Sequence, residues 1–288
     1  MKKMAVILIS FLMLFCFACG KKTPERLAEG SVKFTAENYP KVCVTAYSDK
    51  IGKNLAVSVL GVTPLEASKF ITVCDTTDEC YMKLITGECD IVFAHGYGKR
   101  VAEKLNTTTL ELTTNELVSD ALVFMYNGTG LKGMTTEQII SVYKGEVTNW
   151  SELGGSDTPV TLFGLKDGTA VQNAFQKYIA TDVTVAPVYK TVTTEKGEFK
   201  AEISYDNRQG AIGYTLFTLA GDFNKGTVKP VSVNGIVPNE ETVKSGQYPL
   251  TFPLGVTIRS SEGSGNNVRV LFDWILSEQG KIALGLTS

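Results

Sequence analysis

The sequence predicts an α/β protein of two lobes, each a mostly parallel sheet flanked by helices. Strand-like and helix-like segments alternate in the first part of the chain, and the alternation starts again near residue 121. With 288 residues, of which 43% are hydrophobic and 20% charged, the chain can bury one large core or two modest ones. Neither an internal repeat nor a low-complexity tract interrupts this pattern.

The first unit contains short β-rich runs separated by helix-like stretches. Strands are predicted at residues 42–47, 70–74 and 90–94, and helices through Leu55 to Leu60 and at residues 78–86. Strands alternating with helices indicate a parallel sheet with crossover connections. Ligands bind beyond the carboxyl ends of the strands in such sheets, and here those ends carry Ser48, Thr76-Thr77 and His95.

The second unit repeats the alternation and ends the chain on helices. Its predicted strands are residues 121–126, 160–163 and 210–214, with helices after Thr135 and after the loop 166–169. A later extended run, residues 248–258, is interrupted by two prolines, and residues 267–276 form an amphipathic helix. The turn at 263–265 precedes that helix and is interpreted as a connection.

The N-terminus has the pattern of an export signal. Lys2 and Lys3 precede an apolar stretch, residues 4–18, which is too short to span a membrane as a stable helix. Ala18, Cys19 and Gly20 resemble the lipidation site of bacterial lipoproteins, although Cys16 stands where leucine is usual. Residues 1–18 are thus expected to be a lipoprotein signal peptide and residues 19–35 a lipidated flexible tether. An ordinary cleaved secretory signal is the alternative.

Charge and cysteine content narrow the possible partners. The 28 Lys and Arg against 30 Asp and Glu give a net charge of −2, and no basic run is present, so nucleic acid is excluded as a partner. Four cysteines follow Cys19, and export favours disulfides between them. The single histidine and the lack of a Cys-x-x-Cys motif argue against a metal site, and free thiols are a further alternative.

Several strings resemble, in order, the phosphate-binding proteins of ABC importers. They are residues 90–94, 120–123, 134–140, 144–155, 210–214, 245–250 and 272–280. The match covers nearly the whole mature chain, and the block from Gly145 to Trp150, followed by Gly154-Gly155, is its most specific part. The resemblance implies a two-lobed type II periplasmic binding protein fold with the ligand in a cleft between the lobes, and no catalysis and no cofactor. Lobe 1 is then expected at residues 36–124 plus 233–288, and lobe 2 at residues 125–232.

The ligand-contacting positions of that family carry over only in part. Ser48 occupies the place of the hydroxyl residues after the first strand, and Thr77 that of the Ser or Thr at the next helix start. His95 stands where the family has a carboxylate. The family's arginine before the second-lobe loop is missing, with Lys166 one residue from its position and Thr169 keeping a hydroxyl.

Lys166 or Arg208 is a candidate for the lost positive charge. Helix N-termini suit an anion because they expose unpaired N–H groups, and Thr77 and Thr169 lie at predicted helix starts. Without the arginine the site lacks a bidentate donor for an oxyanion. The candidate ligands are therefore phosphate, another oxyanion or a small organic acid, and an altered pocket is a further alternative. Each of these residues has a plainer interpretation as a cap, a packing residue or a solvated surface residue.

These features predict a monomeric solute-binding lipoprotein on the outer face of the cell membrane or in the periplasm, which delivers a small anion to an ABC permease. A sensory or scaffold lipoprotein without a transporter is the alternative. A hydrolase built on Ser48 and His95 is disfavoured because no Gly-x-Ser-x-Gly elbow is present and no aspartate is evidently placed to orient His95. For the cysteines, Cys43–Cys89 and Cys74–Cys80 are the expected pairs among three possible pairings. Cys43 and Cys89 lie at the starts of predicted strands that should be neighbours, and Cys74 and Cys80 bracket the loop 75–79.

Lipidation at Cys19 gives the first testable prediction. Cys19→Ala is expected to release the protein from the membrane fraction, because the thiol that accepts the lipid is removed. Mass spectrometry of the mature wild-type N-terminus is expected to find the lipid. Unchanged membrane association together with an unmodified N-terminus would contradict this prediction.

Overall fold

The structure is a computed structural model that describes residues 32–181, 183–192, 208–223 and 228–286. The expected signal peptide at residues 1–18, Cys19 and the first part of the expected tether lie outside the described residues, so their assignment stays a prediction. The described residues belong to one compact unit.

The first sheet has the strand order β2-β1-β3-β12-β4. Its strands are β1 (Val42–Val44), β2 (Ile71–Val73), β3 (Ile91–Ala94), β4 (Leu112–Val118) and β12 (Leu254–Arg259). The three strands of the first predicted unit pair in parallel, with Val44 opposite both Val73 and Phe93. Strand β12 returns from the far end of the chain and runs antiparallel to β3 and β4. The predicted parallel arrangement of the first three strands is confirmed.

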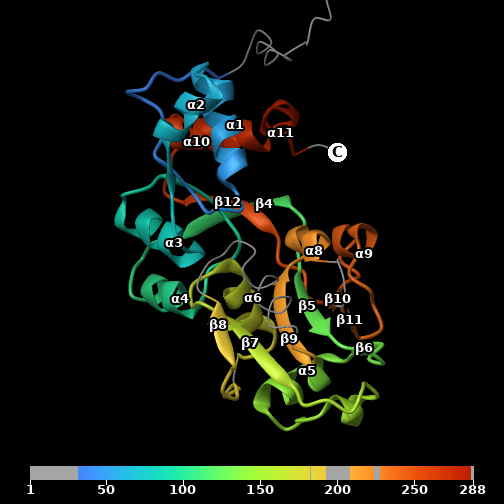
Figure 1. Ribbon diagram of the computed structural model, residues 1–288. Helices are drawn as coiled ribbons and strands as arrows, with labels where there is room; N and C mark the ends of the chain where they lie inside the picture. The colour runs from blue at the N-terminus through green and yellow to red at the C-terminus, as the bar shows by residue number, and fades with distance from the viewer. Residues whose placement is uncertain (1–31, 182, 193–207, 224–227, 287–288) are drawn as a thin grey trace, which may run out of the picture. The chain divides into compact units, whose positions relative to one another are not determined.

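Helices cover both faces of this sheet (Figure 1). On one face lie α1 (Asp49–Leu60), α10 (Asn267–Leu276) and α11 (Glu278–Leu284), with α2 (Pro64–Ala67) and the short helix η1 (Ser68–Phe70) beside α1. The other face is covered by α3 (Thr77–Thr86) and α4 (Lys99–Asn106). Thr76 caps α3 by accepting a hydrogen bond from the Glu79 amide, and Gly87 ends the helix in the left-handed region at φ 79°.

The second sheet has the order β10-β5-β9-β7-β8. Its strands are β5 (Leu122–Asn127), β7 (Thr161–Leu165), β8 (Lys190–Val192), β9 (Ala211–Leu216) and β10 (Val228–Pro230). Strands β7, β8 and β9 are parallel, whereas β5 is antiparallel to both β9 and β10. A separate two-stranded ladder joins β6 (Gly133–Met134) and β11 (Ser232–Val233).

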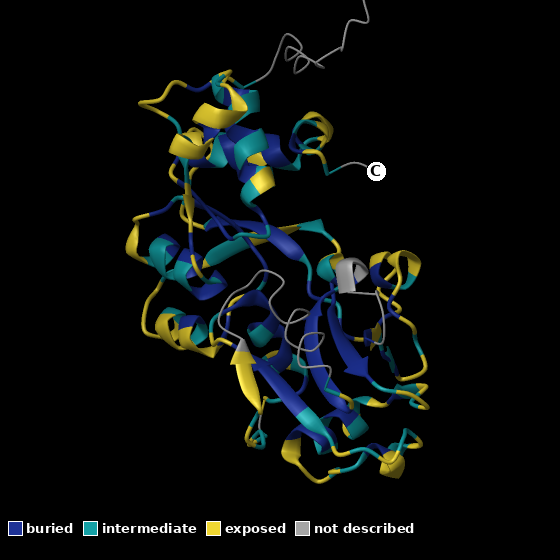
Figure 2. Cartoon of the chain, viewed as in Figure 1, coloured by how far each residue is buried: buried dark blue, intermediate teal, exposed yellow. Residues whose placement is uncertain are grey.

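The core of the second lobe is aromatic. Phe175 on α6 (Ala170–Tyr178) stacks on Tyr214 of β9 at 4.2 Å between ring centroids, and Tyr143 of α5 (Thr136–Lys144) contacts both rings. Strands β5 and β9 are buried along their lengths, as Figure 2 shows. The remaining elements of this lobe are η2 (Trp150–Leu153), α8 (Phe217–Phe223) and α9 (Glu240–Lys244).

The chain passes between the two lobes at places that differ from those expected from the sequence. Strand β5 begins at Leu122 and belongs wholly to the second sheet, so the first crossing precedes residue 122 rather than following residue 124. Val243, Tyr248 and Leu250 are buried in the core of the second lobe, and the return to the first sheet comes just before β12. The boundary expected at residue 233 lies too early in the chain, because the segment after it packs its apolar side chains in the second-lobe core before the chain returns to the first lobe.

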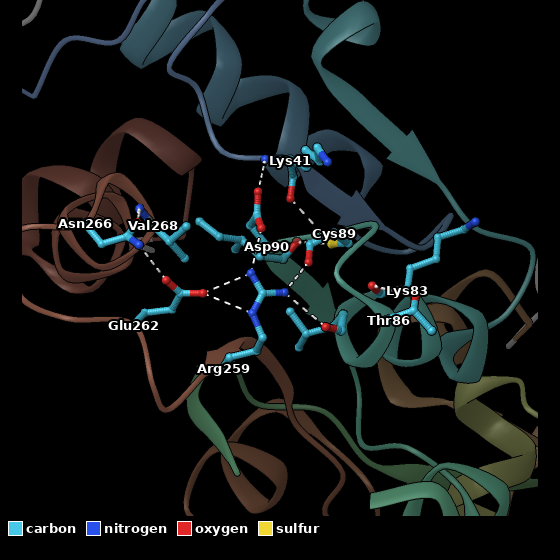
Figure 3. Close-up of polar contacts among 11 residues, drawn as sticks. Lys41, Lys83, Thr86, Cys89, Asp90, Arg259, Glu262, Asn266 and Val268 are labelled. Atoms are coloured by element: carbon cyan, nitrogen blue, oxygen red, sulfur yellow. Dashed lines mark hydrogen bonds and ion pairs between the residues drawn. The ribbon is translucent and has the colours of Figure 1, made fainter. Parts of the chain in front are cut away.

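Arg259, near the end of β12, joins several segments of the first lobe (Figure 3). Its Nη1 donates to the carbonyl oxygens of Leu84 and Cys89 at 3.1 and 2.7 Å, and its Nη2 lies 2.7 Å from Asp90 Oδ1. Glu262 binds the guanidinium through Nε at 3.0 Å. The Arg259 side chain is only 17% exposed, so the loss of this group would leave buried acceptors unpaired.

Replacement of Arg259 tests the contribution of this network. Arg259→Ala is expected to lower the free energy of unfolding by about 3 kcal/mol, because two carboxylates and two carbonyl groups lose a largely buried partner. The control is Arg269→Ala on α10, which breaks a more exposed ion pair with Asp273 and should cost less than about 1 kcal/mol. Urea denaturation of the two variants measures the difference. Equal losses would contradict the network's role.

Candidate functional site

The carboxyl ends of the three parallel strands of the first lobe bring three predicted site residues to one edge of the sheet. Ser48 follows β1, Thr77 follows β2, and His95 follows β3 directly. All three are buried, with exposures of 0%, 0% and 1%. The edge predicted from the sequence is therefore present, although the residues have different environments there.

The Ser48 hydroxyl holds two strand ends together. It donates to the carbonyl oxygen of Phe93 at 2.5 Å and accepts a hydrogen bond from the Thr45 amide at 3.0 Å. The Ser48 hydroxyl donates its proton to a carbonyl of β3, so it anchors the loop between β1 and α1 to that strand. This local role is the one that the plainer interpretation of Ser48 predicted.

The Thr77 hydroxyl differs from that of Ser48, because it is buried and has no hydrogen-bond partner among the described residues. It is the first residue of α3, whereas the capping role belongs to Thr76. Buried polar atoms nearly always have partners, so an unpaired hydroxyl requires an explanation. At the start of α3 the Asp78 and Glu79 amides are already bonded, to the Gly168 carbonyl and the Thr76 hydroxyl. The Thr77 hydroxyl therefore lies at the positive end of the helix dipole beside bonded amides.

His95 is fixed by a buried carboxylate. Its Nε2 lies 3.1 Å from Oδ2 of Asp120, and both side chains are 1% exposed. The ring of Phe252 stacks on the imidazole at 5.9 Å with an interplanar angle of 8°, and Tyr47 meets it edge-on at 6.0 Å. Since an ionised carboxylate only accepts, Nε2 donates the proton, and Nδ1 of the neutral ring then carries a lone pair. That Nδ1 is buried and has no hydrogen-bond partner within the described part of the chain.

Asp120 is a site residue that the sequence analysis missed. It also accepts hydrogen bonds from the Ala121 amide and from the amide and hydroxyl of Thr218, at 2.8, 3.1 and 2.8 Å. No aspartate was evidently placed to orient His95 in the sequence, because Asp120 is distant along the chain and reaches the ring only through the fold. The residues from Asp120 to Val123 indicated a strand in the sequence, but they did not indicate the contact between Asp120 and His95.

The second lobe brings the α6 N-terminus to the same region. Thr169 caps α6: its Oγ1 accepts from the Gln172 amide at 3.3 Å and donates to the Lys166 carbonyl at 2.8 Å. Lys166 itself is exposed. The Gly168 carbonyl accepts a hydrogen bond from the Asp78 amide at 3.1 Å, so this loop directly contacts the start of α3.

Asp78 and Asn173 meet between the two lobes, and the sequence analysis assigned neither of them to the site. Oδ1 of Asp78 accepts from the Gly98 amide at 2.8 Å and from Nδ2 of Asn173 on α6 at 2.9 Å. Asp78 is 7% exposed and Asn173 is 4% exposed. Acidic residues are common in the first turn of a helix, so Asp78 gave no sequence signal that set it apart.

Arg208 lies in a different part of the second lobe. Its guanidinium stacks on the ring of Tyr189 at 3.8 Å, and its Nη2 donates to the Tyr189 hydroxyl at 2.6 Å. Both residues line a cavity of about 370 Å³ beside α5 and β7, together with Val142, Val160 and Leu162. None of Ser48, Thr77, His95 and Thr169 lines this cavity.

The four cysteines gather in the core of the first lobe, as their proposed pairing requires. The structure records Cys43, Cys74, Cys80 and Cys89 as free and buried. They belong to one buried core cluster, in which Cys89 Sγ donates to the Ile91 carbonyl at 3.0 Å. Their proposed pairing stays a prediction. In the described residues no group of three or more His, Cys, Asp or Glu could hold a metal ion.

The His95 tautomer is directly measurable because the chain has a single histidine. In untagged protein labelled with ¹⁵N, the imidazole spectrum is expected to show the proton on Nε2, because Asp120 accepts it. Asp120→Asn is expected to shift the tautomer population, since the amide can present a donor to the ring. A matched control is Asp157→Asn, whose exposed carboxylate binds only the Asn149 side chain in the described structure. A neutral ring protonated on Nδ1 in the wild type would contradict the assignment.

Comparisons with known proteins agree with the fold. A family model described as a PBP superfamily domain matches residues 66–279. A phosphate-binding protein PstS of Bacillus subtilis is 29% identical over 121 residues, covering 42% of this chain and 38% of the relative. A PstS of Staphylococcus haemolyticus is 22% identical over 70% of this chain and 66% of its own length. The chain thus spans less than two thirds of each of these curated relatives.

Two solved structures share the fold at low identity. A phosphate transport receptor of the ABC type from Vibrio cholerae has a TM-score of 0.65 at 19% identity, covering 85% of this chain and 97% of that structure. A putative phosphate ABC transporter substrate-binding protein from Clostridium perfringens, described with bound phosphate, has a TM-score of 0.57 at 21% identity, with coverages of 84% and 96%. At such identities the likeness establishes the fold alone.

Proposed function

The chain belongs to the PBP superfamily, and we propose that it is the exported, lipid-anchored solute-binding receptor of an ABC importer. It captures a small oxyanion between its two lobes and delivers it to a permease as a monomer, without chemical turnover. Phosphate is the first candidate ligand, because the relatives in Bacillus subtilis and Staphylococcus haemolyticus are named phosphate-binding proteins.

One observation carries the proposal: the buried side-chain atoms without a hydrogen-bond partner in the described structure include two, Thr77 Oγ1 and His95 Nδ1, that belong to residues indicated by the sequence as ligand contacts and lie at the same edge of the first sheet. The Thr77 hydroxyl is a donor and acceptor at the N-terminus of α3, and His95 Nδ1 is a lone-pair acceptor when the ring is neutral. An oxyanion that keeps a proton fits this pair. Its bare oxygens accept from the Thr77 hydroxyl at the positive end of the helix dipole, and its O–H donates to Nδ1.

The same geometry supports binding rather than hydrolysis. Ser48 directs its hydroxyl to the Phe93 carbonyl, whereas His95 pairs with Asp120, so these residues do not form a nucleophile and base. The described residues contain no helix that is long and apolar enough to cross a membrane. In this proposal, attachment to the membrane depends on Cys19, which lies outside those residues.

A thermal-shift titration with phosphate tests the proposed function. A ligand that binds only the native state stabilises it by about 2.7 kcal/mol at a hundredfold excess over Kd. Thr77→Val keeps the shape of the side chain but removes the hydroxyl, and is expected to weaken phosphate binding by about tenfold or more.

The matched control is Thr86→Val at the other end of α3, where the hydroxyl binds the Lys83 carbonyl and Glu88. This variant should keep wild-type affinity. If phosphate and other small oxyanions and carboxylates all leave the melting temperature unchanged, the importer proposal is wrong, and a sensory or scaffold lipoprotein becomes the better account.

A further inference from the structure

The start of α3 and the α6 segment of the second lobe are joined by hydrogen bonds that use only the chain's own groups. The Asp78 amide donates to the Gly168 carbonyl at 3.1 Å. In the opposite direction, Nδ2 of Asn173 donates to Asp78 Oδ1 at 2.9 Å and lies 3.4 Å from the Gly96 carbonyl. These contacts therefore do not require a ligand to bridge the lobes.

The Asp78 carboxylate is held on both sides. Within its own lobe, Oδ1 accepts from the amide of Gly98, the residue that precedes α4. A carboxylate at a helix N-terminus is favoured by the dipole, and hydrogen bonds to a charged group are stronger than those between neutral groups. The side chain is 7% exposed, which limits competition from water for the Asn173 amide.

Two glycines permit the close approach of the lobes. A Cβ on Gly98 would lie 2.4 Å from Oδ1 of Asn173, a distance at which the side chain must move. Gly168 has φ +81°, which favours glycine, and a Cβ there would meet the Asp78 Cβ at 3.3 Å. The backbone is therefore shaped for this contact on both lobes.

From these observations we propose that Asp78 and Asn173 keep the two lobes together before ligand binds. We call the hydrogen bonds that join Asp78 to Gly98, Gly168 and Asn173 the latch. These contacts position the site, because Asp78 is next to Thr77 in the chain and its partner Gly168 is next to Thr169. Asn173 acts through its bond to Asp78. This inference deepens the proposed function. It gives the receptor a substantial closed population without ligand, so that less of the binding free energy is spent on closure.

The test uses ligand-free, full-length mature protein, so its outcome does not depend on which anion binds. Asn173→Ala removes the side-chain bonds between the lobes but leaves the Asp78 to Gly98 bond intact. It is expected to reduce the ratio of closed to open protein by about tenfold or more, seen as a larger radius of gyration in small-angle X-ray scattering. Gly98→Ala should have the same effect by displacing Asn173.

Hydrogen exchange separates the latch from general loss of structure. In Asn173→Ala the Asp78 amide should lose protection, whereas the Gly98 amide should keep it. In Asp78→Ala the Gly98 amide should lose protection as well. The control is Asp75→Ala, an exposed residue of the same loop, which should match the wild type in both measurements.

The latch would be excluded if wild type, Asn173→Ala and Gly98→Ala had equal radii of gyration and equally fast exchange at the Asp78 amide. A phosphate titration of the same wild-type sample distinguishes this failure from a failure of the proposed function. A protein that binds phosphate but shows no closed ligand-free population overturns the latch alone.

Discussion

The parallel pairing of β1, β2 and β3 is the constraint on which the site depends. Their register places Val44 opposite Val73 and Phe93, so the three strands end together at one edge of the sheet. The hydroxyl of Ser48 fixes this edge by bonding the Phe93 carbonyl. Because α3 starts directly beyond β2 and His95 directly follows β3, the Thr77 hydroxyl and the imidazole are delivered to the same edge.

The electrostatics of this edge depend on neutral groups more than on cations. Of the two cations considered as replacements for the missing arginine, Lys166 is exposed and Arg208 stacks on Tyr189 elsewhere in the second lobe. An anion beside Thr77 would be stabilised by the dipole at the α3 N-terminus and by the Thr77 hydroxyl. The buried Asp120 is satisfied by Ala121, Thr218 and His95. It lies where the two connecting segments meet, since the Phe252 amide donates to the Asp120 carbonyl at 2.6 Å.

The sequence predicted the elements well, because apolar spacing and caps are local signals. The helix expected at residues 267–276 has these bounds in the structure, and the strands of the first unit agree to within a few residues. The lobe boundary was less accurate because Tyr248 and Leu250 could have packed on either core. Strand ends likewise placed Ser48, Thr77 and His95, since the order of parallel strands determines which loops share an edge.

The partners of the site residues could not be predicted from the sequence. The contact between His95 and Asp120, and that between Asp78 and Asn173, each join segments that are distant in the chain. Neither Asp120 nor Asn173 occurs in a motif that would indicate its partner. The lack of a partner for the Thr77 hydroxyl could not be predicted either, because the sequence alone does not show whether Thr76 or Thr77 caps α3. The structure assigns the cap to Thr76.

The central claim is that a small oxyanion binds between Thr77 and His95. The most direct measurement is a crystal structure with arsenate, a heavier analogue of phosphate whose anomalous scattering locates the anion. The account predicts a peak within hydrogen-bond distance of Thr77 Oγ1 and His95 Nδ1, both of which are buried without a hydrogen-bond partner in the described structure. A peak found only beside Arg208 in the second-lobe cavity, or no bound anion at saturating arsenate, would contradict it.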